Sequence, residues 1–252
     1  MNLLQKISPK APKDLDKKEI KEETAKIVEK LASLQQLLYA QNKYSLLIII
    51  QGMDASGKDG AIRNVFSSLN PQGVHVTSFK QPTEEEKKHD FLWRIHAHCP
   101  ERGMIEVFNR SHYEDVLITR VHGWCNDETA KKRFIAINNF EELISENNDT
   151  IILKFYLHIS HEEQKERFQE RLNDPTKHWK YNINDKMESK SWDDYMKMYE
   201  DVFEYCNKIP WIIVPSNQNW FKEYTIASTV LKSLESLDMK YPELKKKNGS
   251  GK

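Results

Sequence analysis

The sequence predicts an α/β fold in which a parallel β-sheet carries helices on both faces. Residues 45–51 form a continuous apolar run, which is typical of a strand covered on both sides. Strand-like and helix-like segments alternate along the chain, as they do in βαβ units. A glycine-rich loop at residues 52–58 directly joins the apolar strand to the next helix.

Length and charge limit the classes of function. The 252 residues are enough for one α/β domain with a lid. Lys and Arg number 38, as do Asp and Glu, so no global field favours nucleic acid or a membrane surface. We therefore expect a soluble, cytoplasmic protein with neither partner. The three cysteines lie far apart and are expected to be free thiols.

The first expected helix covers residues 16–42 and is amphipathic. Its apolar face is formed by residues spaced seven, four, three and four apart, namely Ile20, Ile27, Leu31, Leu34 and Leu38. This face packs either on the core or on a second copy of the protein. The apolar strand at 45–51 follows, and then a helix over residues 59–69.

The middle of the chain continues the alternation. Turn residues at 70–73 precede an alternating strand at 74–79. Thr83 and Glu86 form a capping box that is expected to open a helix running to about Cys99. The next elements expected, in order, are a strand at 103–108, helices at 111–121 and 127–147, and a strand at 150–157.

A second capping box at residues 160–163 predicts a helix to Leu172. Residues 173–190 are polar and contain Pro175, so we expect a mobile segment. A helix at 191–206, a strand at 211–215 and a helix to about residue 237 complete the chain. The predicted organisation is an N-terminal helical extension (1–42), one domain (43–240) with a lid at about 160–192, and a flexible tail (241–252).

The glycine-rich loop is the strongest functional signal. Its spacing, Gly52-x-x-x-x-Gly57-Lys58, lets backbone N–H groups turn toward phosphate oxygens, while the lysine neutralises charge. A strand before the loop and a helix after it are the context that this motif requires. The expected phosphate-binding residues are Gly52, Ala55, Ser56, Gly57, Lys58, Asp59 and Gly60.

Two acidic residues make this loop unusual. Asp59 stands where Ser or Thr normally ligates Mg²⁺, and first-turn helix capping is an equal alternative for it. Asp54 would repel phosphates unless a cation lay between them, so we expect it to hold Mg²⁺ or to orient the waters of the ion. A turn-stabilising contact is the alternative for Asp54.

A second cluster follows the strand at 103–108. Ligands of open α/β sheets bind beyond the carboxyl ends of the strands, so this cluster and the loop should face one crevice. Arg110 is expected to clamp a phosphate, and Glu114 and Asp115 could supply acid groups, with a solvated helix face as the alternative. Asn109 stands where a Walker B motif would place Asp, and Arg120 lies further along the same helix.

Several ordered motifs together resemble the polyphosphate kinase 2 family. They are GMDASGKDG at 52–60, NPQG at 70–73, SFKQP at 78–82, HDFLWR at 89–94, FNRSHYEDVL at 108–117, RVH at 120–122, KHWK at 177–180 and WDDY at 192–195. The resemblance covers roughly residues 10–235 in the order of the family. It implies a P-loop kinase-like fold, dependence on Mg²⁺ (or Mn²⁺), and reversible phosphoryl transfer between inorganic polyphosphate and nucleotides.

The resemblance also assigns residues to roles. Asp54 and Lys58 match essential loop residues, Arg110 a phosphate ligand, and Arg167 and Arg171 the arginines of a basic lid. Asn109, followed by His-Tyr-Glu-Asp, resembles the branches that phosphorylate AMP, some of which continue to ATP. This makes Asn109 a doubtful metal ligand and favours Asp54, with Glu114 near the acceptor.

These assignments give the expected site. The catalytic set is Asp54, Lys58, Arg110, Glu114 and Arg167. Arg171, Lys177 and Lys180 are expected to extend the polyphosphate track, with salt bridges to Glu163, Glu166 and Glu170 as the alternative for the lid arginines. The expected nucleotide-binding residues are Lys80, Arg94, Asn109, Glu114, Asp115 and Arg120.

The expected partners are polyphosphate, AMP, ADP and ATP, guanine nucleotides as further acceptors, and copies of the chain in a homodimer or homotetramer. An ATP-dependent nucleoside monophosphate kinase is the alternative enzyme. A non-catalytic phosphate- or nucleotide-sensing module is the alternative from another class.

Overall fold

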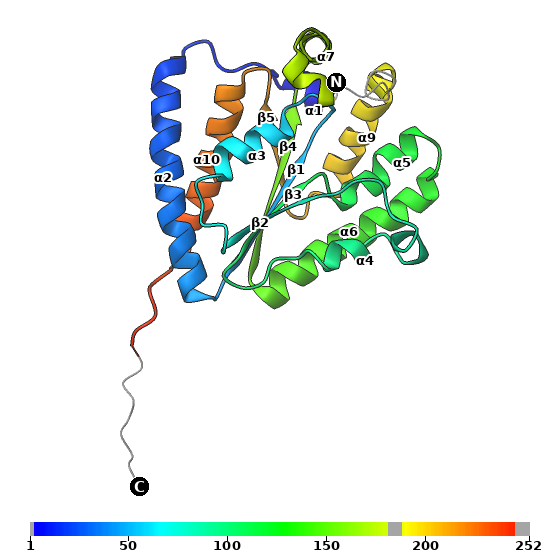
Figure 1. Ribbon diagram of the computed structural model, residues 1–252. Coiled ribbons are helices and arrows are strands. Elements are labelled where there is room, and N and C mark those ends of the chain that lie inside the picture. Colours follow the sequence, from blue (N-terminus) through cyan, green and yellow to red (C-terminus); the bar gives the residue numbers. More distant parts are fainter. Residues whose placement is uncertain (1–2, 181–187, 245–252) are drawn as a thin grey trace.

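The computed structural model describes residues 3–180 and 188–244, and its centre is a sheet of five strands (Figure 1). The strand order is β2-β3-β1-β4-β5, and every neighbouring pair is parallel. The strands are β1 (Ser45–Gln51), β2 (Val74–Ser78), β3 (Ile105–Asn109), β4 (Thr150–His158) and β5 (Trp211–Pro215). The predicted α/β class with a parallel sheet is confirmed.

Helices cover both faces of the sheet (Figure 1). One layer contains α2 (Lys17–Gln41), α3 (Lys58–Phe66) and α10 (Asn219–Glu235). The other contains α4 (Trp93–His96), α5 (Ile118–Val121), α6 (Asp127–Asn148) and α9 (Trp192–Tyr205). The short α1 (Leu3–Lys6), which the sequence did not predict, packs near α9.

The central strand β1 explains why its sequence is apolar throughout. Leu46, Ile48 and Ile50 pack into the cluster under α2, α3 and α10. Leu47 and Ile49 pack into the cluster on the opposite face. Both faces of β1 are therefore buried, as its sequence predicts.

The apolar face of α2 packs on the core of the same chain. Ile27, Leu31 and Leu38 belong to the cluster that includes α10, and Ile20 is also buried. The side chain of Asp16 caps the helix by accepting the N–H groups of Lys18 and Glu19. This favours the core over a second copy as the partner of that face.

The predicted helix over residues 83–99 is wrong. The capping box forms, since Thr83 N–H donates to Glu86 Oε2 at 2.7 Å and Glu86 N–H to Thr83 Oγ1 at 3.2 Å. It opens only a 3₁₀ turn, η1 (Glu86–Lys88), because His89 is extended at φ −110° and ψ 173°. The Asp90 side chain then accepts the Leu92 N–H at 2.9 Å and starts a new turn that leads to α4.

The predicted helix over residues 111–121 is also interrupted. It consists of a 3₁₀ helix, η2 (His112–Val116), and the separate α5, and Leu117 between them has φ −106° and ψ −87°. The Ser111 hydroxyl caps η2 and accepts from Gln51 Nε2 at 3.0 Å. This second bond ties η2 to the end of β1.

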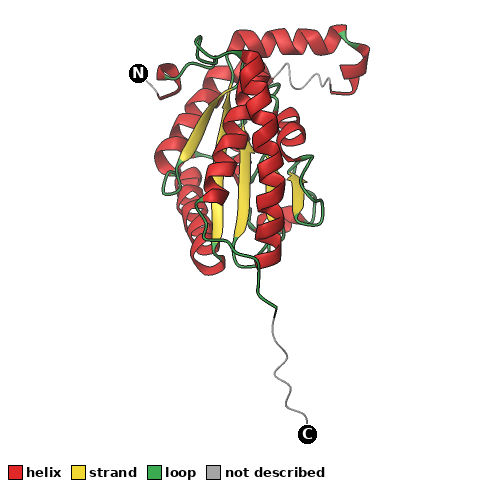
Figure 2. Cartoon of the chain, turned by 90° about the vertical axis from the view of Figure 1, so that its left-hand side faces the viewer, coloured by secondary structure: helices red, strands yellow, loops and turns green. Residues whose placement is uncertain are grey.

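The segment predicted to be a lid begins beyond the carboxyl end of β4. Ser160 caps α7 (His161–Asn173), which crosses the end of the sheet (Figure 2). Within the segment predicted to be mobile (173–190), the structure describes the 3₁₀ helix η3 (Pro175–Lys180) and the start of η4 (Ser189–Ser191). Its residues 181–187 lie outside the described residues, and the predicted domain boundaries remain predictions.

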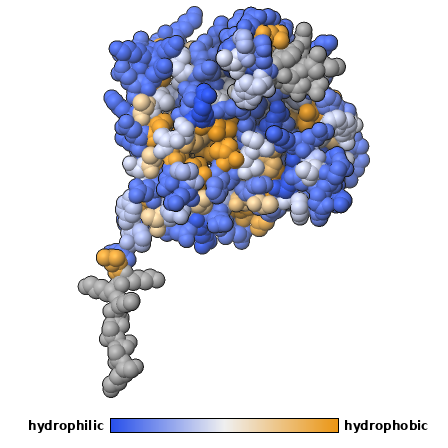
Figure 3. All heavy atoms as spheres, in the orientation of Figure 1, coloured by the Kyte–Doolittle hydropathy of each residue, from blue (hydrophilic) through white to orange (hydrophobic). Residues whose placement is uncertain are grey.

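The surface is mainly hydrophilic, with apolar side chains gathered near the middle of the face seen in Figure 3. The strand β2 lies at an edge of the sheet, and its Val76 is 49% exposed. Across residues 3–180 and 188–244, none of the helices is both long and apolar enough to cross a bilayer.

Candidate active site

The carboxyl ends of three neighbouring strands bring the predicted segments together. Asn109, the last residue of β3, pairs with Ile50 of β1 on one side and with Ser78 of β2 on the other. The glycine-rich loop leaves β1 at this edge, and Arg110 leaves β3. Arg110 N–H also donates to Ile50 O at 3.1 Å. The two predicted clusters therefore share one crevice, as the parallel topology requires.

A cavity of about 520 Å³ lies at this edge of the sheet. Most of the predicted site residues line it, namely Asp54, Ala55, Gly57, Lys58, Asp59, Gly60, Lys80, Asn109, Arg110 and Arg171. Ser78, Phe79 and Trp179 complete the lining. Lys58, Lys80, Arg110 and Arg171 are all basic, so the cavity suits a polyanion.

The loop backbone adopts conformations that need glycine at two positions. Gly52 has φ +152°, and a Cβ there would lie 2.9 Å from Ser56 Oγ and 3.0 Å from Leu157 Cβ. Gly57 has φ +91°, and a Cβ there would collide with the Lys222 ammonium. Ala55 also has a positive φ of 64°. Strained backbone of this kind is concentrated in ligand-binding loops.

Arg110 links the loop to η2. Its Nη2 lies 2.5 Å from Asp54 Oδ1, and its Nη1 lies 3.1 Å from Glu114 Oε2. Burial would raise the pKa of Asp54, but Arg110 and Lys58 outweigh burial and hold the pKa below its ordinary value. Asp54 is therefore an ionised carboxylate that lines the cavity. Arg110 itself has φ 64°, an unusual conformation for a residue with a side chain.

Lys58 binds the loop that precedes it. Its Nζ donates to Gly52 O at 2.7 Å and to Met53 O at 3.2 Å. Burial, and then the charge of Arg110, lower the pKa of Lys58 to about 8. Further along the cavity wall, Asn109 Nδ2 donates to Asp59 Oδ1 at 2.9 Å. Asn109, in the Walker B position, thus contacts Asp59, which stands where Ser or Thr normally ligates Mg²⁺.

Arg94 and Asp115 lie behind the cavity wall. Arg94 is buried and donates to Lys80 O at 2.8 Å. Its Nη2 lies 4.0 Å from Asp115 Oδ2. Burial raises the pKa of Asp115 to about 6. Arg94 therefore supports the segment that carries Lys80 and does not line the cavity.

Arg120 lies away from the cavity. Its Nη2 contacts Asp127 at 2.7 Å and Asp201 at 2.8 Å. These bonds join α5 to the start of α6 and to α9. The structure therefore places Arg120 in a packing role that differs from the predicted nucleotide-binding role.

The predicted lid residues divide into two groups. Arg171 lines the cavity, and its guanidinium lies 5.4 Å from the centre of the Phe168 ring. Lys177 instead pairs with Asp174 at 3.4 Å and with Glu170 at 3.7 Å. The side chain of Lys180 lies outside the described residues.

Arg167 does not point into the cavity. Its Nε donates to Glu163, its Nη1 to the carbonyls of Ala55 and Ser56, and its Nη2 to those of Ser216 and Asn217. These five acceptors match the five N–H groups of a guanidinium. The arrangement differs from the predicted contact with phosphate, because the donors of Arg167 are engaged behind the loop.

Comparison with known proteins identifies the family. A family model described as polyphosphate kinase 2 matches residues 14–242. The chain belongs to the polyphosphate kinase 2 family. The resemblance in the sequence motifs is therefore confirmed.

Curated relatives and a solved structure agree with this assignment. The chain is 43% identical over 216 residues to the AMP/ADP-polyphosphate phosphotransferase of Meiothermus ruber, covering 85% of this chain and 80% of that protein. It is 44% identical over 230 residues to the ADP-polyphosphate phosphotransferase of Rhodopseudomonas palustris, covering 86% and 79%. The crystal structure of polyphosphate kinase 2 from Arthrobacter aurescens TC1 is similar with a TM-score of 0.93 and 42% identity, over 96% of this chain and 88% of that one. The predicted P-loop kinase-like fold is confirmed with the family.

In this polyphosphate kinase 2 family member, a buried polar cluster supports η2. Glu141 of α6 accepts from Tyr113 Oη at 2.6 Å and from Lys154 Nζ at 2.7 Å, and His112 Nε2 lies 3.3 Å away. Lys154 and Glu141 are almost completely buried. Since Tyr113 and His112 belong to η2, the cluster fixes the helix that carries Glu114.

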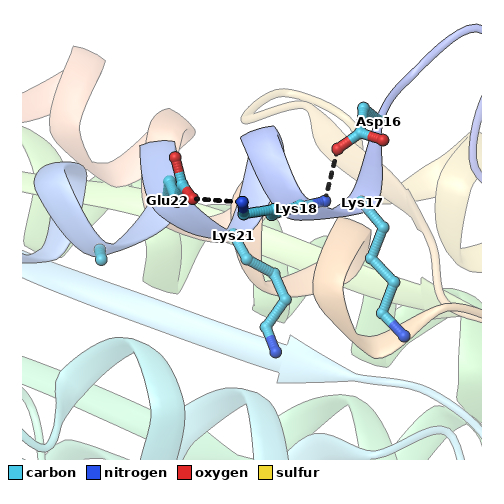
Figure 4. A pocket seen from close by; sticks show the side chains of 6 residues that line it. Asp16, Lys17, Lys18, Lys21 and Glu22 are labelled. Carbon is cyan, nitrogen blue, oxygen red and sulfur yellow. Dashed lines mark hydrogen bonds and ion pairs between the residues drawn. The ribbon is translucent and has the colours of Figure 1, made fainter.

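A second hollow lies at the start of α2, away from the strand ends (Figure 4). It is lined by Asp16, Lys17, Lys18, Lys21, Glu22 and Ala25. Lys18 Nζ lies 4.0 Å from Glu22 Oε1, and Asp16 caps the helix. The predicted site residues lie elsewhere, so this hollow is not part of the site.

Three residues near the loop were missed by the sequence analysis. Trp179 lines the cavity and is 78% exposed. It lies inside the KHWK motif, so the motif itself offered a signal. Gln164 of α7 and Lys222 of α10 are buried and bind the loop backbone. Neither has a local signal in the sequence, because each reaches the loop only through the packing of its helix.

Proposed function

We propose that this chain transfers phosphoryl groups reversibly between inorganic polyphosphate and adenine nucleotides, and so converts AMP to ADP and ADP to ATP. The printed names of the Meiothermus ruber and Rhodopseudomonas palustris relatives support these substrates. The observation that carries the proposal is that Lys58, Lys80, Arg110 and Arg171 converge on the cavity at the strand ends. Guanine nucleotides as further acceptors, a homodimer or homotetramer, and a cytoplasmic location remain predictions.

The basic lining supports a simple reaction. Phosphoryl transfer depends mainly on alignment and charge neutralisation, so the protein need not supply a nucleophile. Polyphosphate lies along Lys58, Arg110 and Arg171. A phosphate oxygen of the nucleotide attacks the terminal phosphorus of polyphosphate, and the bond from that phosphorus to its bridging oxygen breaks. The nucleotide gains one phosphate, and the shortened polyphosphate keeps the bridging oxygen.

The cavity also fits a divalent cation. Mg²⁺ is usually held by one or two carboxylates together with substrate phosphates and water. Asp54 is ionised and lines the cavity, and Asp59 and Asn109 offer further oxygens there. In the part of the chain that the structure describes, no group of three or more His, Cys, Asp or Glu residues could hold a metal by itself. Asp54 would therefore hold Mg²⁺, or Mn²⁺, jointly with phosphate oxygens, and the ion would neutralise charge on them.

An ATP-dependent nucleoside monophosphate kinase shares the loop and is the alternative enzyme. The two proposals differ in the phosphate donor. We would incubate the protein with Mg²⁺, AMP or ADP, and either long-chain polyphosphate or ATP, and identify the nucleotides formed. ADP and ATP formed from polyphosphate support the proposal.

ADP formed from AMP and ATP, without any product from polyphosphate, would support the monophosphate kinase. A non-catalytic sensing module would bind nucleotide or polyphosphate tightly in every mixture without turnover. A parallel incubation with a chelator tests the metal, since removal of Mg²⁺ should abolish transfer.

A further inference from the structure

The carbonyl groups of the glycine-rich loop at residues 52–58 accept hydrogen bonds from side chains. Lys58 Nζ binds the carbonyls of Gly52 and Met53, as described above. Gln164 Nε2 donates to Asp54 O at 2.9 Å. Arg167 Nη1 donates to Ala55 O at 2.9 Å and to Ser56 O at 3.1 Å. Lys222 Nζ donates to Ser56 O at 3.4 Å and to Gly57 O at 3.1 Å. Every carbonyl from Gly52 to Gly57 thus accepts from a side chain.

These side chains come from different parts of the fold and are themselves fixed. Gln164 accepts from Ser189 Oγ at 2.9 Å. Arg167 also binds the carbonyls of Ser216 and Asn217, which follow β5. Lys222 Nζ donates to Asn219 Oδ1 at 2.8 Å and is 1% exposed. The loop is therefore attached to α7, to α10 and to the end of β5.

The direction of the carbonyls decides the direction of the N–H groups. In a trans peptide the C=O and N–H of one unit point in opposite directions. The carbonyls of residues 54–57 turn toward Gln164, Arg167 and Lys222, which leaves the N–H groups of the same peptides on the other side. The Ser56 N–H is the exception, because it donates to Met53 O at 3.1 Å. The first N–H groups of α3, which begins at Lys58, also lack partners within the helix. Such groups together form an anion-binding concavity.

A buried ammonium group in this place is costly. Burial and the nearby charge of Arg167 lower the pKa of Lys222 to about 7. A lysine needs compensating hydrogen bonds to remain in such an environment. The three acceptors of Lys222 match the three N–H groups of an ammonium, so its contact with the loop is specific.

We propose that Lys222, together with Arg167 and Gln164, is a positioning residue that holds the carbonyls of residues 54–57 away from the cavity and so keeps the remaining N–H groups of these peptides directed at the phosphate chain. The proposal rests on the proposed function, because it requires that the loop bind phosphate. Lys222 does not line the cavity and acts through the loop. Its role is thus distinct from that of Lys58.

The test replaces Lys222 by Met, which removes the donors and keeps much of the side-chain volume. A displaced loop raises KM for polyphosphate, and kcat/KM should fall by about 30- to 100-fold, as for a misplaced binding group. A variant that is only partly folded would lose apparent kcat in proportion to its unfolded fraction, and its KM would not change. The matched control is Lys232→Met, at an exposed position of the same helix, which should behave like the unaltered protein.

Two further measurements keep the outcome clear. Lys222→Gln retains an amide donor and should lie between the Met variant and the unaltered protein in KM. Calorimetric titration with inorganic tripolyphosphate measures loop binding without turnover, and Lys222→Met should bind it at least about tenfold more weakly. This titration distinguishes failure of the inference from failure of the proposed activity.

The proposal is overturned if folded Lys222→Met binds tripolyphosphate and uses polyphosphate as the unaltered protein does. It is also overturned if both Lys222 variants fail to fold, since the residue would then serve the fold as a whole. If the unaltered protein binds tripolyphosphate but transfers nothing from polyphosphate, only the proposed activity fails.

Discussion

Arg110 Nη2 and Asp54 Oδ1 lie 2.5 Å apart, so the residue that directly follows β3 is bonded to a residue inside the glycine-rich loop. The same guanidinium also binds Glu114 of η2. These contacts connect the loop and the strand end, which line one cavity, to η2. The predictions below follow from this connection and from the buried groups around it.

Replacing Asp54 by Asn should reduce phosphoryl transfer by about 100-fold, since the site loses the carboxylate that would hold the metal, and the metal would neutralise charge on the phosphates. The measurement is the initial rate with polyphosphate and ADP over a range of Mg²⁺ concentrations. Asp127→Asn is the matched control, because Asp127 also pairs with an arginine but is 79% exposed and lies away from the cavity. A normal rate for Asp54→Asn would refute its assigned role.

Replacing Arg110 by Lys should lower kcat/KM by about 10- to 100-fold, because one ammonium cannot reproduce the planar fork that spans Asp54 and Glu114. Arg63→Lys on the exposed side of α3 provides the control. Steady-state kinetics with polyphosphate varied would show the loss. If Arg110→Lys and Arg63→Lys had the same kcat/KM, the planar guanidinium of Arg110 would not be needed.

Binding of tripolyphosphate should be accompanied by proton uptake between about pH 7 and pH 9. The pKa values of Lys58 and Lys222 are lowered to about 8 and about 7, so part of these amines is neutral in that range. A bound anion favours the charged form, raises both pKa values and draws protons from solution. Calorimetry in two buffers of different ionisation enthalpy measures the uptake.

The difference between variants assigns this uptake to a residue. Lys222→Met should take up fewer protons than the unaltered protein, whereas Lys232→Met should match it. Identical uptake by all three proteins would show that Lys222 does not titrate on binding.

Lys154→Met should destabilise the protein by about 3–5 kcal/mol, because it leaves the buried Glu141 carboxylate without its ammonium partner. Urea unfolding measures the change. Lys208→Met, which removes the partner of Glu142 in an exposed pair, should cost about 0–1 kcal/mol. Equal losses of stability in the two variants would show that the buried pair stabilises the fold no more than the exposed pair does.

The sequence could predict those parts of the site that follow from the order of strands, loops and helices along the chain. The apolar run before Gly52 and the helix after Lys58 define the loop, and parallel topology then brings Asn109 and Arg110 to the same edge. The helix predicted over 83–99 failed because hydrophobic pattern does not reveal the extended conformation of His89.

The sequence could not predict the roles of residues that depend on contacts between segments far apart in the chain. Spacing places Arg167 and Arg171 on one face of α7, but it does not show that Arg167 meets the loop carbonyls while Arg171 reaches the cavity. In the sequence, Lys222 cannot be distinguished from other lysines of an amphipathic helix. It contacts the loop only because α10 packs beside it. These roles depend on which helices become neighbours, and a single sequence does not specify this locally.

The central claim is that polyphosphate is the phosphoryl donor. The most direct test is to incubate the protein with Mg²⁺, ADP and polyphosphate labelled with ³²P, and to locate the label in the nucleotide product. Our account predicts label in the γ-phosphate of ATP, and its loss when Asp54 is replaced by Asn. Unlabelled nucleotide, with the label retained in polyphosphate, would contradict it.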